Sequence, residues 1–242
     1  MEKNTEKLMK TKVFNVIILD KSGSMERIRQ AAIDGFNETL AGIKKAQEKY
    51  AETQEHFVSL LTFCSCERNY VYDKTPATEA RPLGMDDYQP CCCTPLYDAV
   101  GFTLTSMRNH VSALEDAVVV VTIITDGLEN ASREYTAVAV KELIEKLRQQ
   151  GWTFTFMGAN QDSIETAAKM SIRNARNFEY SDSGIRKGWL KETKTRMSFF
   201  SKLDGFSRSM CAEEGSMPNP DVRKLRFTEM ADEAFDEEDS EA

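Results

Sequence analysis

The sequence predicts an α/β fold: a doubly wound, mostly parallel six-stranded sheet with one antiparallel edge strand and helices on both faces. Short apolar runs alternate along the chain with longer segments whose apolar residues recur at helical spacing. The runs are almost continuously apolar, which is typical of parallel strands buried on both faces. With 242 residues, the chain has room for one large domain or one domain with an extension.

The first part of the chain supplies three of the expected strands. Residues 13–19 are apolar except for Asn15, and residues 25–50 then carry apolar side chains at helical spacing. Residues 57–63 and 68–72 are two further strands. The link between these two is too short for the crossover that parallel neighbours need, so 68–72 is expected to pair antiparallel at an edge.

The middle of the chain predicts a loop, a helix and a central strand. Residues 75–94 contain three prolines and a glycine, so we expect a loop with at most a short helical turn near 85–87. A helix is expected to follow from Pro95, because proline is tolerated in a first turn. Residues 117–125 form the most strongly β-branched run of the chain and are expected to be a central strand.

The alternation continues to about residue 180. We expect a helix over 133–150, a strand over 152–157, a helix over 163–170 and a final strand over 177–180. We therefore divide the chain into four parts. These are an N-terminal segment (1–11), the sheet domain (12–182), a C-terminal helical extension (183–228) and an acidic tail (229–242).

The negative charge of the chain is concentrated in that tail. The formal net charge is −8, and residues 229–242 carry eight acidic residues and no basic ones, so the first 228 residues are formally neutral. A block of like charge is usually solvated, and we expect the tail to be disordered. A neutral body without a basic stripe gives no support for nucleic-acid binding.

The N-terminal region also limits the location that the sequence predicts. Residues 1–12 are polar and charged, without the apolar segment of a signal peptide, and no apolar run of the chain approaches the length of a membrane span. The expected location is therefore the cytoplasm, with no membrane partner.

Five polar side chains follow strands or precede helices. Asp20, Ser22 and Ser24 come directly after the first strand, Thr94 lies just before a helix, and Asp126 ends the central strand. Ligands of open α/β sheets bind at the carboxyl ends of strands, so the fold could bring all five together. Their oxygens suit Mg²⁺, with Mn²⁺ or Ca²⁺ as alternatives, and are poor ligands for soft metals.

Three ordered motifs carry a resemblance to a known family. They are Asp-x-Ser-Gly-Ser-Met from Asp20, Thr-Pro-Leu from Thr94, and Thr-Asp-Gly around Asp126. Together they resemble the metal-ion-dependent adhesion site (MIDAS) of the von Willebrand factor type A (vWA) domain, a Rossmann-like fold, over roughly residues 12–180. Segments 126–132 and 158–162 further resemble a bacterial and phage cytosolic subgroup of such proteins.

The resemblance implies a role for each of these residues. Ser22, Ser24 and Thr94 would bind the metal through hydroxyl oxygens, and Asp20 and Asp126 would bind it directly or through waters. In such families a Glu or Asp of a partner protein commonly completes the metal's coordination shell. The resemblance thus implies a non-catalytic, metal-dependent protein–protein interaction module. A second reading is an accessory partner of an AAA+ ATPase in metal insertion or complex remodelling.

The same residues also allow a purely structural interpretation and two catalytic ones. A single serine here could merely cap the following helix, and Asp126-Gly127 could merely form a turn. Asp20 could be the nucleophile of a Mg²⁺-dependent phosphatase, but Ser22 stands where the usual second Asp would be. A Ser-His-Asp hydrolase needs a histidine, and His56 and His110 are each expected to be surface or boundary residues.

Two further features have no assigned role. Cys64 and Cys66 follow the second strand, and Cys91, Cys92 and Cys93 directly precede the proposed ligand threonine. They could be ordinary reduced cysteines, a redox switch whose disulfide alters Mg²⁺ affinity, or ligands of another metal, although their spacings are not those usual for structural zinc. The carboxylates of the acidic tail could also occupy the metal site of their own or a neighbouring chain.

Overall fold

The computed structural model describes residues 10–114, 116–159, 162–212 and 219–240. It contains one six-stranded sheet with the order β3-β2-β1-β4-β5-β6. The strands are β1 (Thr11–Asp20), β2 (Gln54–Phe63), β3 (Arg68–Pro76), β4 (Ala117–Thr125), β5 (Thr153–Ala159) and β6 (Asn174–Phe178). All neighbours pair parallel except β2 and β3, so the expected mostly parallel sheet with an antiparallel edge strand is confirmed.

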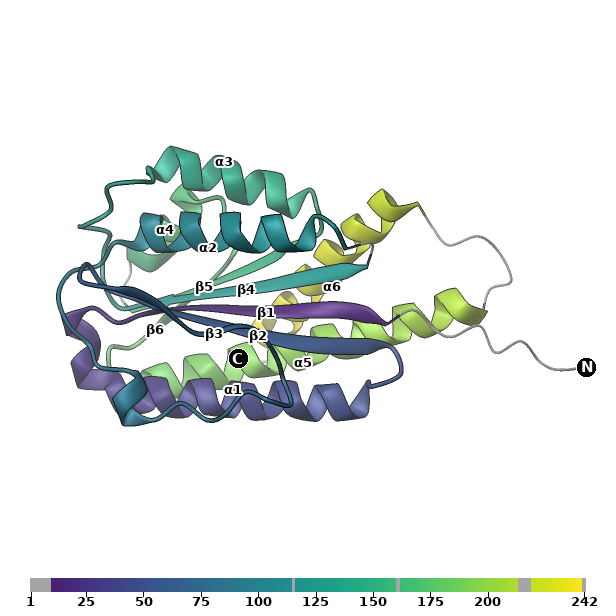
Figure 1. Ribbon diagram of the computed structural model, residues 1–242, viewed down its shortest axis with the longest axis horizontal. Helices are drawn as coiled ribbons and strands as arrows, with labels where there is room; N and C mark the ends of the chain where they lie inside the picture. The colour runs from purple at the N-terminus through teal and green to yellow at the C-terminus, as the bar shows by residue number, and fades with distance from the viewer. Residues whose placement is uncertain (1–9, 115, 160–161, 213–218, 241–242) are drawn as a thin grey trace, which may run out of the picture.

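The helices cover both faces of the sheet (Figure 1). They are η1 (Gly23–Ile28), α1 (Arg29–Lys49), η2 (Met85–Asp87), α2 (Leu96–Val111), α3 (Ala137–Arg148), α4 (Asp162–Lys169), α5 (Asp182–Ala212) and α6 (Pro220–Ser240). Helices α1 and α5 lie on one face, and α2, α3 and α4 lie on the other. None of the helices in these described ranges is both long and apolar enough to cross a membrane.

Two apolar cores result from this arrangement. Alternate residues of a strand point to opposite faces, so Ile17 packs under α1 and α5, whereas Ile18 packs under α2 and α3. Both side chains are fully buried. This is why the central strands are continuously apolar in the sequence.

The ends of two elements differ from expectation for identifiable reasons. Helix α3 begins at Ala137 rather than near residue 133, because the backbone of residues 133–135 is bonded to Asp98 instead. Strand β6 spans Asn174–Phe178 rather than 177–180. Its buried residues include Asn174 and Arg176, whose polarity hides the strand from an apolar-pattern search.

The acidic tail is the main correction. We expected residues 229–242 to be disordered, but the structure places 229–240 in helix α6. Phe227, Met230 and Ala234 recur at helical spacing and are buried against the core shared with α5. Glu241 and Ala242 lie outside the described residues, as do residues 1–9.

The tail carboxylates are paired with basic side chains from β6, from the residue just before it, and from α5. Arg173 contacts Asp236, Arg176 contacts Asp239 and Lys202 contacts Glu237, at 2.8–2.9 Å. Because these partners neutralise the like charges, the acidic segment can fold as a helix against the domain. These contacts therefore give no support to the hypothesis that the tail carboxylates occupy the metal site of their own chain. The four-part division of the chain stays a prediction.

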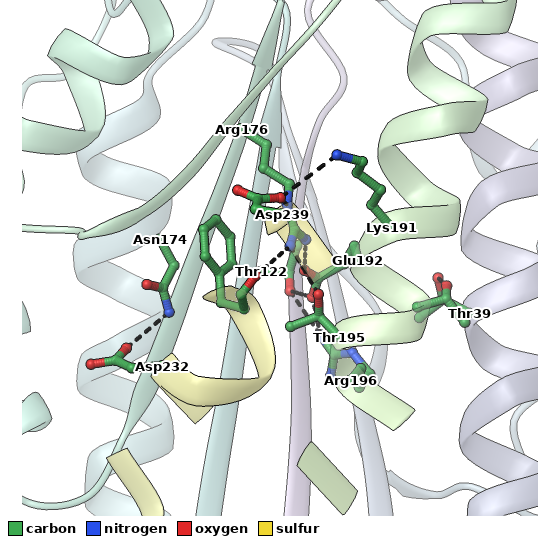
Figure 2. Close-up of polar contacts among 12 residues, drawn as sticks. Thr39, Thr122, Asn174, Arg176, Lys191, Glu192, Thr195, Arg196, Asp232 and Asp239 are labelled. Atoms are coloured by element: carbon green, nitrogen blue, oxygen red, sulfur yellow. Dashed lines mark hydrogen bonds and ion pairs between the residues drawn. The ribbon is translucent and has the colours of Figure 1, made fainter. Parts of the chain in front are cut away.

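A buried polar network fixes α5 on the sheet (Figure 2). The guanidinium of Arg196 donates to Asn15 of β1 and Thr122 of β4, each at 2.7 Å, and to Glu192 at 3.1 Å. Arg196 and Glu192 are each 1% exposed. Removing one member of such a buried pair typically costs about 3–5 kcal/mol, because the other charge stays buried without compensation.

The contact between α1 and α5 depends on a glycine. The fully buried indole of Trp189 lies so close to Gly35 that a Cβ added there would be 2.1 Å from an indole carbon. No side chain fits between the two helices at this point. Gly35 belongs to α1 and Trp189 to α5. Gly205 of α5, by contrast, has no neighbour within 4 Å of such a Cβ.

These two glycines form a matched pair of test positions. We expect Gly35→Ala to lower the free energy of unfolding by roughly 1–3 kcal/mol, because the indole must move out of a packed core. The control Gly205→Ala is expected to leave stability unchanged or raise it by up to about 1 kcal/mol, through higher helix propensity. Urea denaturation measures both. Equal stability of the two variants would contradict this packing of α5 on α1.

Candidate metal centre

The candidate site lies where two adjacent parallel strands end. Strands β1 and β4 pair in register up to Leu19 and Ile124, so Asp20 and Thr125 terminate them side by side, and Asp126 follows. The loops before η1 and α2 meet the sheet at the same edge, on the left of Figure 1. The topology therefore brings the three sequence motifs to one place, as expected for an open α/β sheet.

Asp20 is fixed by bonds to both of its carboxylate oxygens. Oδ1 accepts a hydrogen bond from the backbone N–H of Ser22 at 2.7 Å, and Oδ2 accepts one from the hydroxyl of Thr125 at 2.5 Å. The side chain is fully buried. Burial raises the pKa of Asp20 to about 6, because desolvation of the charged form outweighs these two bonds, and repulsion from Asp126 adds to the effect.

Ser22, Ser24 and Asp126 form a short chain of contacts. The hydroxyl of Ser24 donates to Oδ1 of Asp126 at 2.8 Å and lies 3.2 Å from the hydroxyl of Ser22. The other oxygen of Asp126, Oδ2, is buried, and none of the described residues forms a hydrogen bond with it. Burial also raises the pKa of Asp126 and outweighs the lowering effect of the neighbouring hydroxyls of Ser24 and Tyr180. A buried carboxylate oxygen without a donor is unfavourable unless a cation or proton compensates it.

Thr94 is brought to the same place by the loop before α2. The backbone N–H of Thr94 donates to Oδ1 of Asn130 at 2.9 Å, and the backbone N–H of Asn130 donates to the carbonyl of Thr94 at 3.1 Å. A Cβ added to Gly127 would lie 2.9 Å from the Thr94 hydroxyl and 3.7 Å from Oδ2 of Asp20. The hydroxyl and the carboxylate therefore share one small space, which a side chain at residue 127 would fill.

Two acidic residues hold the loop that follows β4. Glu129 accepts hydrogen bonds from the backbone N–H groups of Tyr97, Ala131 and Ser132 at 2.7–3.0 Å. Asp98 accepts three more, from residues 133–135, at 2.7–2.9 Å. Burial alone would raise the pKa of Asp98, but these three donors lower it below its ordinary value. The loop carrying Asn130 is thus tied to the start of α2 beside Thr94.

Two tyrosines at the site were missed by the sequence analysis. The fully buried Tyr88 donates its hydroxyl proton to the backbone carbonyl of Asp20, and Tyr180 donates to the carbonyl of Ser24. The guanidinium of Arg27 lies 5.4 Å from the ring of Tyr180. The tyrosines brace the first motif from two distant segments. Tyr180 is the last residue of the final strand expected from the sequence. Its position at the end of a strand could have predicted that it lies at the same edge of the sheet as the site.

The two histidines lie away from this cluster. His56, expected at a surface or boundary, is instead 1% exposed and packs edge-on against Phe200. Burial, together with the positive charge of Arg196, lowers its pKa to about 3. Its ring contacts Gln54 and Asn15 rather than a serine. His110 is exposed near the end of α2. Neither arrangement supports a Ser-His-Asp hydrolase.

The chemistry of the cluster suits a hard divalent cation. Three hydroxyls and two buried carboxylates offer only oxygen, and no ion pair within the described ranges reaches either carboxylate. The uncompensated charge of Asp20 and Asp126 is what a cation would neutralise. Without a cation, burial of the two carboxylates favours protonation, as their raised pKa values indicate.

Comparisons with known proteins give a consistent answer about the fold. No family model matches the sequence, and no curated protein matches it either. A structure of a von Willebrand factor type A protein from Catenulispora acidiphila aligns over 78% of this chain with a TM-score of 0.56 and 14% identity. The chain has the von Willebrand factor type A fold.

Two other structures with this vWA fold are similar to the chain. The pilus adhesin SpaC from Lactobacillus rhamnosus GG, in an open conformation, covers 79% of it with a TM-score of 0.59 and 14% identity. Proximal thread matrix protein 1 from the mussel byssus, with a zinc-occupied MIDAS motif, covers 78% with a TM-score of 0.53 and 13% identity. The alignments span 43%, 30% and 46% of the three proteins, less than half of each.

The raised pKa of Asp20 predicts that the stability of the metal-free protein depends on pH. The pKa is raised on folding, so the contribution of Asp20 to stability is present below about pH 4 and lost as the pH rises through about 6. Between pH 4 and 7, we expect the free energy of unfolding to fall, relative to Asp20→Asn, by up to about 3 kcal/mol. Urea denaturation in a chelator measures the difference.

Comparison with Asp20→Asn isolates this effect. The lowered pKa of His56 acts in the opposite sense, since its contribution is lost as the pH falls below about 6, but it is common to both proteins. A stability difference between wild type and Asp20→Asn that is constant from pH 4 to 7 would contradict the assignment of a buried, ionisable Asp20.

Proposed function

We propose that this chain is a non-catalytic protein-interaction module that binds a carboxylate of a partner protein through a divalent cation. The cation would be held by Asp20, Ser22, Ser24, Thr94 and Asp126. The observation that carries the proposal is the unpartnered, buried Oδ2 of Asp126 beside a cluster of hydroxyls. Such an oxygen is explained by a cation, and the donor set around it is one that a hard cation accepts.

The residues divide into two groups by charge. Ser22, Ser24 and Thr94 would bind through neutral hydroxyl oxygens, and Asp20 and Asp126 would offset the charge of the cation directly or through waters. When bound, the cation supplies a Lewis-acidic position for an outside carboxylate. We propose Mg²⁺, with Mn²⁺ or Ca²⁺ as alternatives, because every ligand atom is a hard oxygen.

Exposed apolar side chains near the cluster support a protein partner. Leu128, two residues after Asp126, is 57% exposed, and Met85 of η2 is 44% exposed. The loop of η2 is tied to the beginning of α1, because Arg29 donates to the carbonyls of Met85 and Tyr88. Apolar side chains beside a polar anchor are typical of a protein interface, where they add buried area around a specific contact.

A capture experiment with a matched pair of serine variants tests this function. Immobilised wild type is expected to retain partner proteins from its native source in Mg²⁺ and to release them in a chelator. Ser24→Ala removes one proposed ligand and should weaken metal binding roughly tenfold or more, with a parallel loss of capture. Ser112→Ala, whose hydroxyl bonds to Asn109 at the end of α2, is the control and should behave as wild type.

Calorimetric titration with Mg²⁺ and mass spectrometry of the retained proteins provide the two readouts. Capture that persists in chelator, or that is equal in Ser24→Ala and wild type, would overturn the metal-dependent mechanism. Retention of an AAA+ ATPase as the main metal-dependent partner would instead support the accessory role.

A further inference from the structure

Four cysteine side chains from two distant loops gather beside the candidate metal centre. Cys64 and Cys66 lie in the turn between β2 and β3, and Cys91 and Cys92 lie in the loop before α2. The sulfur atoms of Cys64 and Cys91 are 3.2 Å apart, and Cys66 and Cys92 form a disulfide. The sulfurs of Cys64, Cys66 and Cys91 all lie within 4.8 Å of one another.

Backbone hydrogen bonds hold the two loops in this position. The N–H of Cys91 donates to the carbonyl of Lys21 at 2.8 Å, and the N–H of Gly23 donates to the carbonyl of Cys92 at 3.0 Å. On the other side, the N–H of Ser65 donates to the carbonyl of Cys93 at 2.9 Å. The backbone hydrogen bonds that hold the loop after β1 therefore also position the cysteine cluster.

The backbone at Cys92 is strained. Its φ is +60°, a left-handed conformation that is uncommon for residues other than glycine and costs of order 1–3 kcal/mol. A glycine would adopt this conformation without the cost, yet the position carries a cysteine, whose sulfur is bonded to Cys66.

We propose that Cys64, Cys66, Cys91 and Cys92 bind one Zn²⁺ ion as a tetrahedral thiolate site when the disulfide is reduced. Zinc–sulfur bonds of about 2.3 Å at tetrahedral angles require sulfur separations of about 3.8 Å. The sulfur atoms of Cys64, Cys66 and Cys91 all lie within 4.8 Å of one another, and those of Cys64 and Cys91 are 3.2 Å apart, so each separation exceeds that value by at most about 1 Å. Cys64 and Cys91 are free, and opening the Cys66–Cys92 bond supplies the other two thiolates.

Formation of the site is balanced in two steps. A dithiol reductant transfers two electrons and two protons to the disulfide, which becomes two thiols while the reductant becomes a disulfide. Zinc then replaces the protons of four thiols, releasing four protons and leaving a site of net charge −2. The reverse sequence is loss of the ion with uptake of four protons, followed by thiol–disulfide exchange of Cys66 and Cys92 with the disulfide form of the same reductant, which is returned to its dithiol form.

The ligand chemistry separates this site from the neighbouring oxygen cluster. Soft thiolates select zinc, whereas the hydroxyls and carboxylates of the other site select hard cations, so the two sites would bind different metals. Sequence spacing concealed the thiolate site, because Cys-x-Cys and adjacent cysteines differ from the usual zinc patterns. The pairing arises between loops that are 26 residues apart at Cys66 and Cys92.

Cobalt substitution of the full chain tests the proposal independently of any function. Protein reduced with a phosphine and freed of metal is titrated with Co²⁺, which is expected to give a thiolate-to-metal charge-transfer band and intense tetrahedral d–d bands at one ion per chain. Zn²⁺ should abolish both by displacement. Ions bound at the oxygen cluster produce no thiolate band, so the two sites are distinguished.

Serine variants assign the ligands. Cys91→Ser and Cys92→Ser should each reduce the charge-transfer intensity and lower zinc content after dialysis to background. The exposed Cys93, next in the chain, is the control, and Cys93→Ser should bind as wild type. Reduced wild type without a charge-transfer band would overturn the proposal, whatever the folding of the variants. Equal loss in Cys93→Ser would overturn the ligand assignment.

Discussion

Two buried carboxylates lie at the ends of adjacent parallel strands, and no basic side chain of the described residues forms an ion pair with either of them. Asp20 is fully buried, and Asp126 presents an oxygen with no donor. Hydrogen bonds from Ser22, Thr125 and Ser24 orient the two groups, but burial still raises both pKa values. Placing like charges together in this way is unfavourable unless a proton or a cation is bound. The surrounding hydroxyls are suited to the cation.

The rest of the fold keeps these two groups in place from two directions. Behind the site, Arg196 of α5 bonds to β1 and β4 at Asn15 and Thr122, so the strands that end in the carboxylates are tied to the helix that covers them. In front, the loop after β4 is tied to α2 by Glu129 and Asp98. A ligand set contributed by three segments requires this kind of support, because small displacements would separate its oxygens.

The sheet and the place where the five polar residues meet could be predicted from the sequence, because apolar runs mark buried strands and Asp20 and Asp126 follow two of them directly. The prediction that the tail is disordered was wrong because it considered the acidic charges without their basic partners. Phe227 and Met230 already had helical spacing in the sequence. Arg173 and Arg176, which pair with the tail carboxylates, are remote in sequence and could not be recognised as partners. Tyr88 could not be predicted, since its role is a contact across the fold from an irregular loop. For the cysteines, the sequence left a disulfide or a metal site open, but it could not show that Cys66 pairs with Cys92.

The most direct test of the account is a crystal structure of the chain with Mn²⁺, with an anomalous difference map collected at the manganese edge. One strong peak is expected among the hydroxyl oxygens of Ser22, Ser24 and Thr94, with Oδ2 of Asp126 turned toward it or toward one of its waters. A fully ordered site without a peak there, or a peak that those three hydroxyls do not contact, would contradict the account.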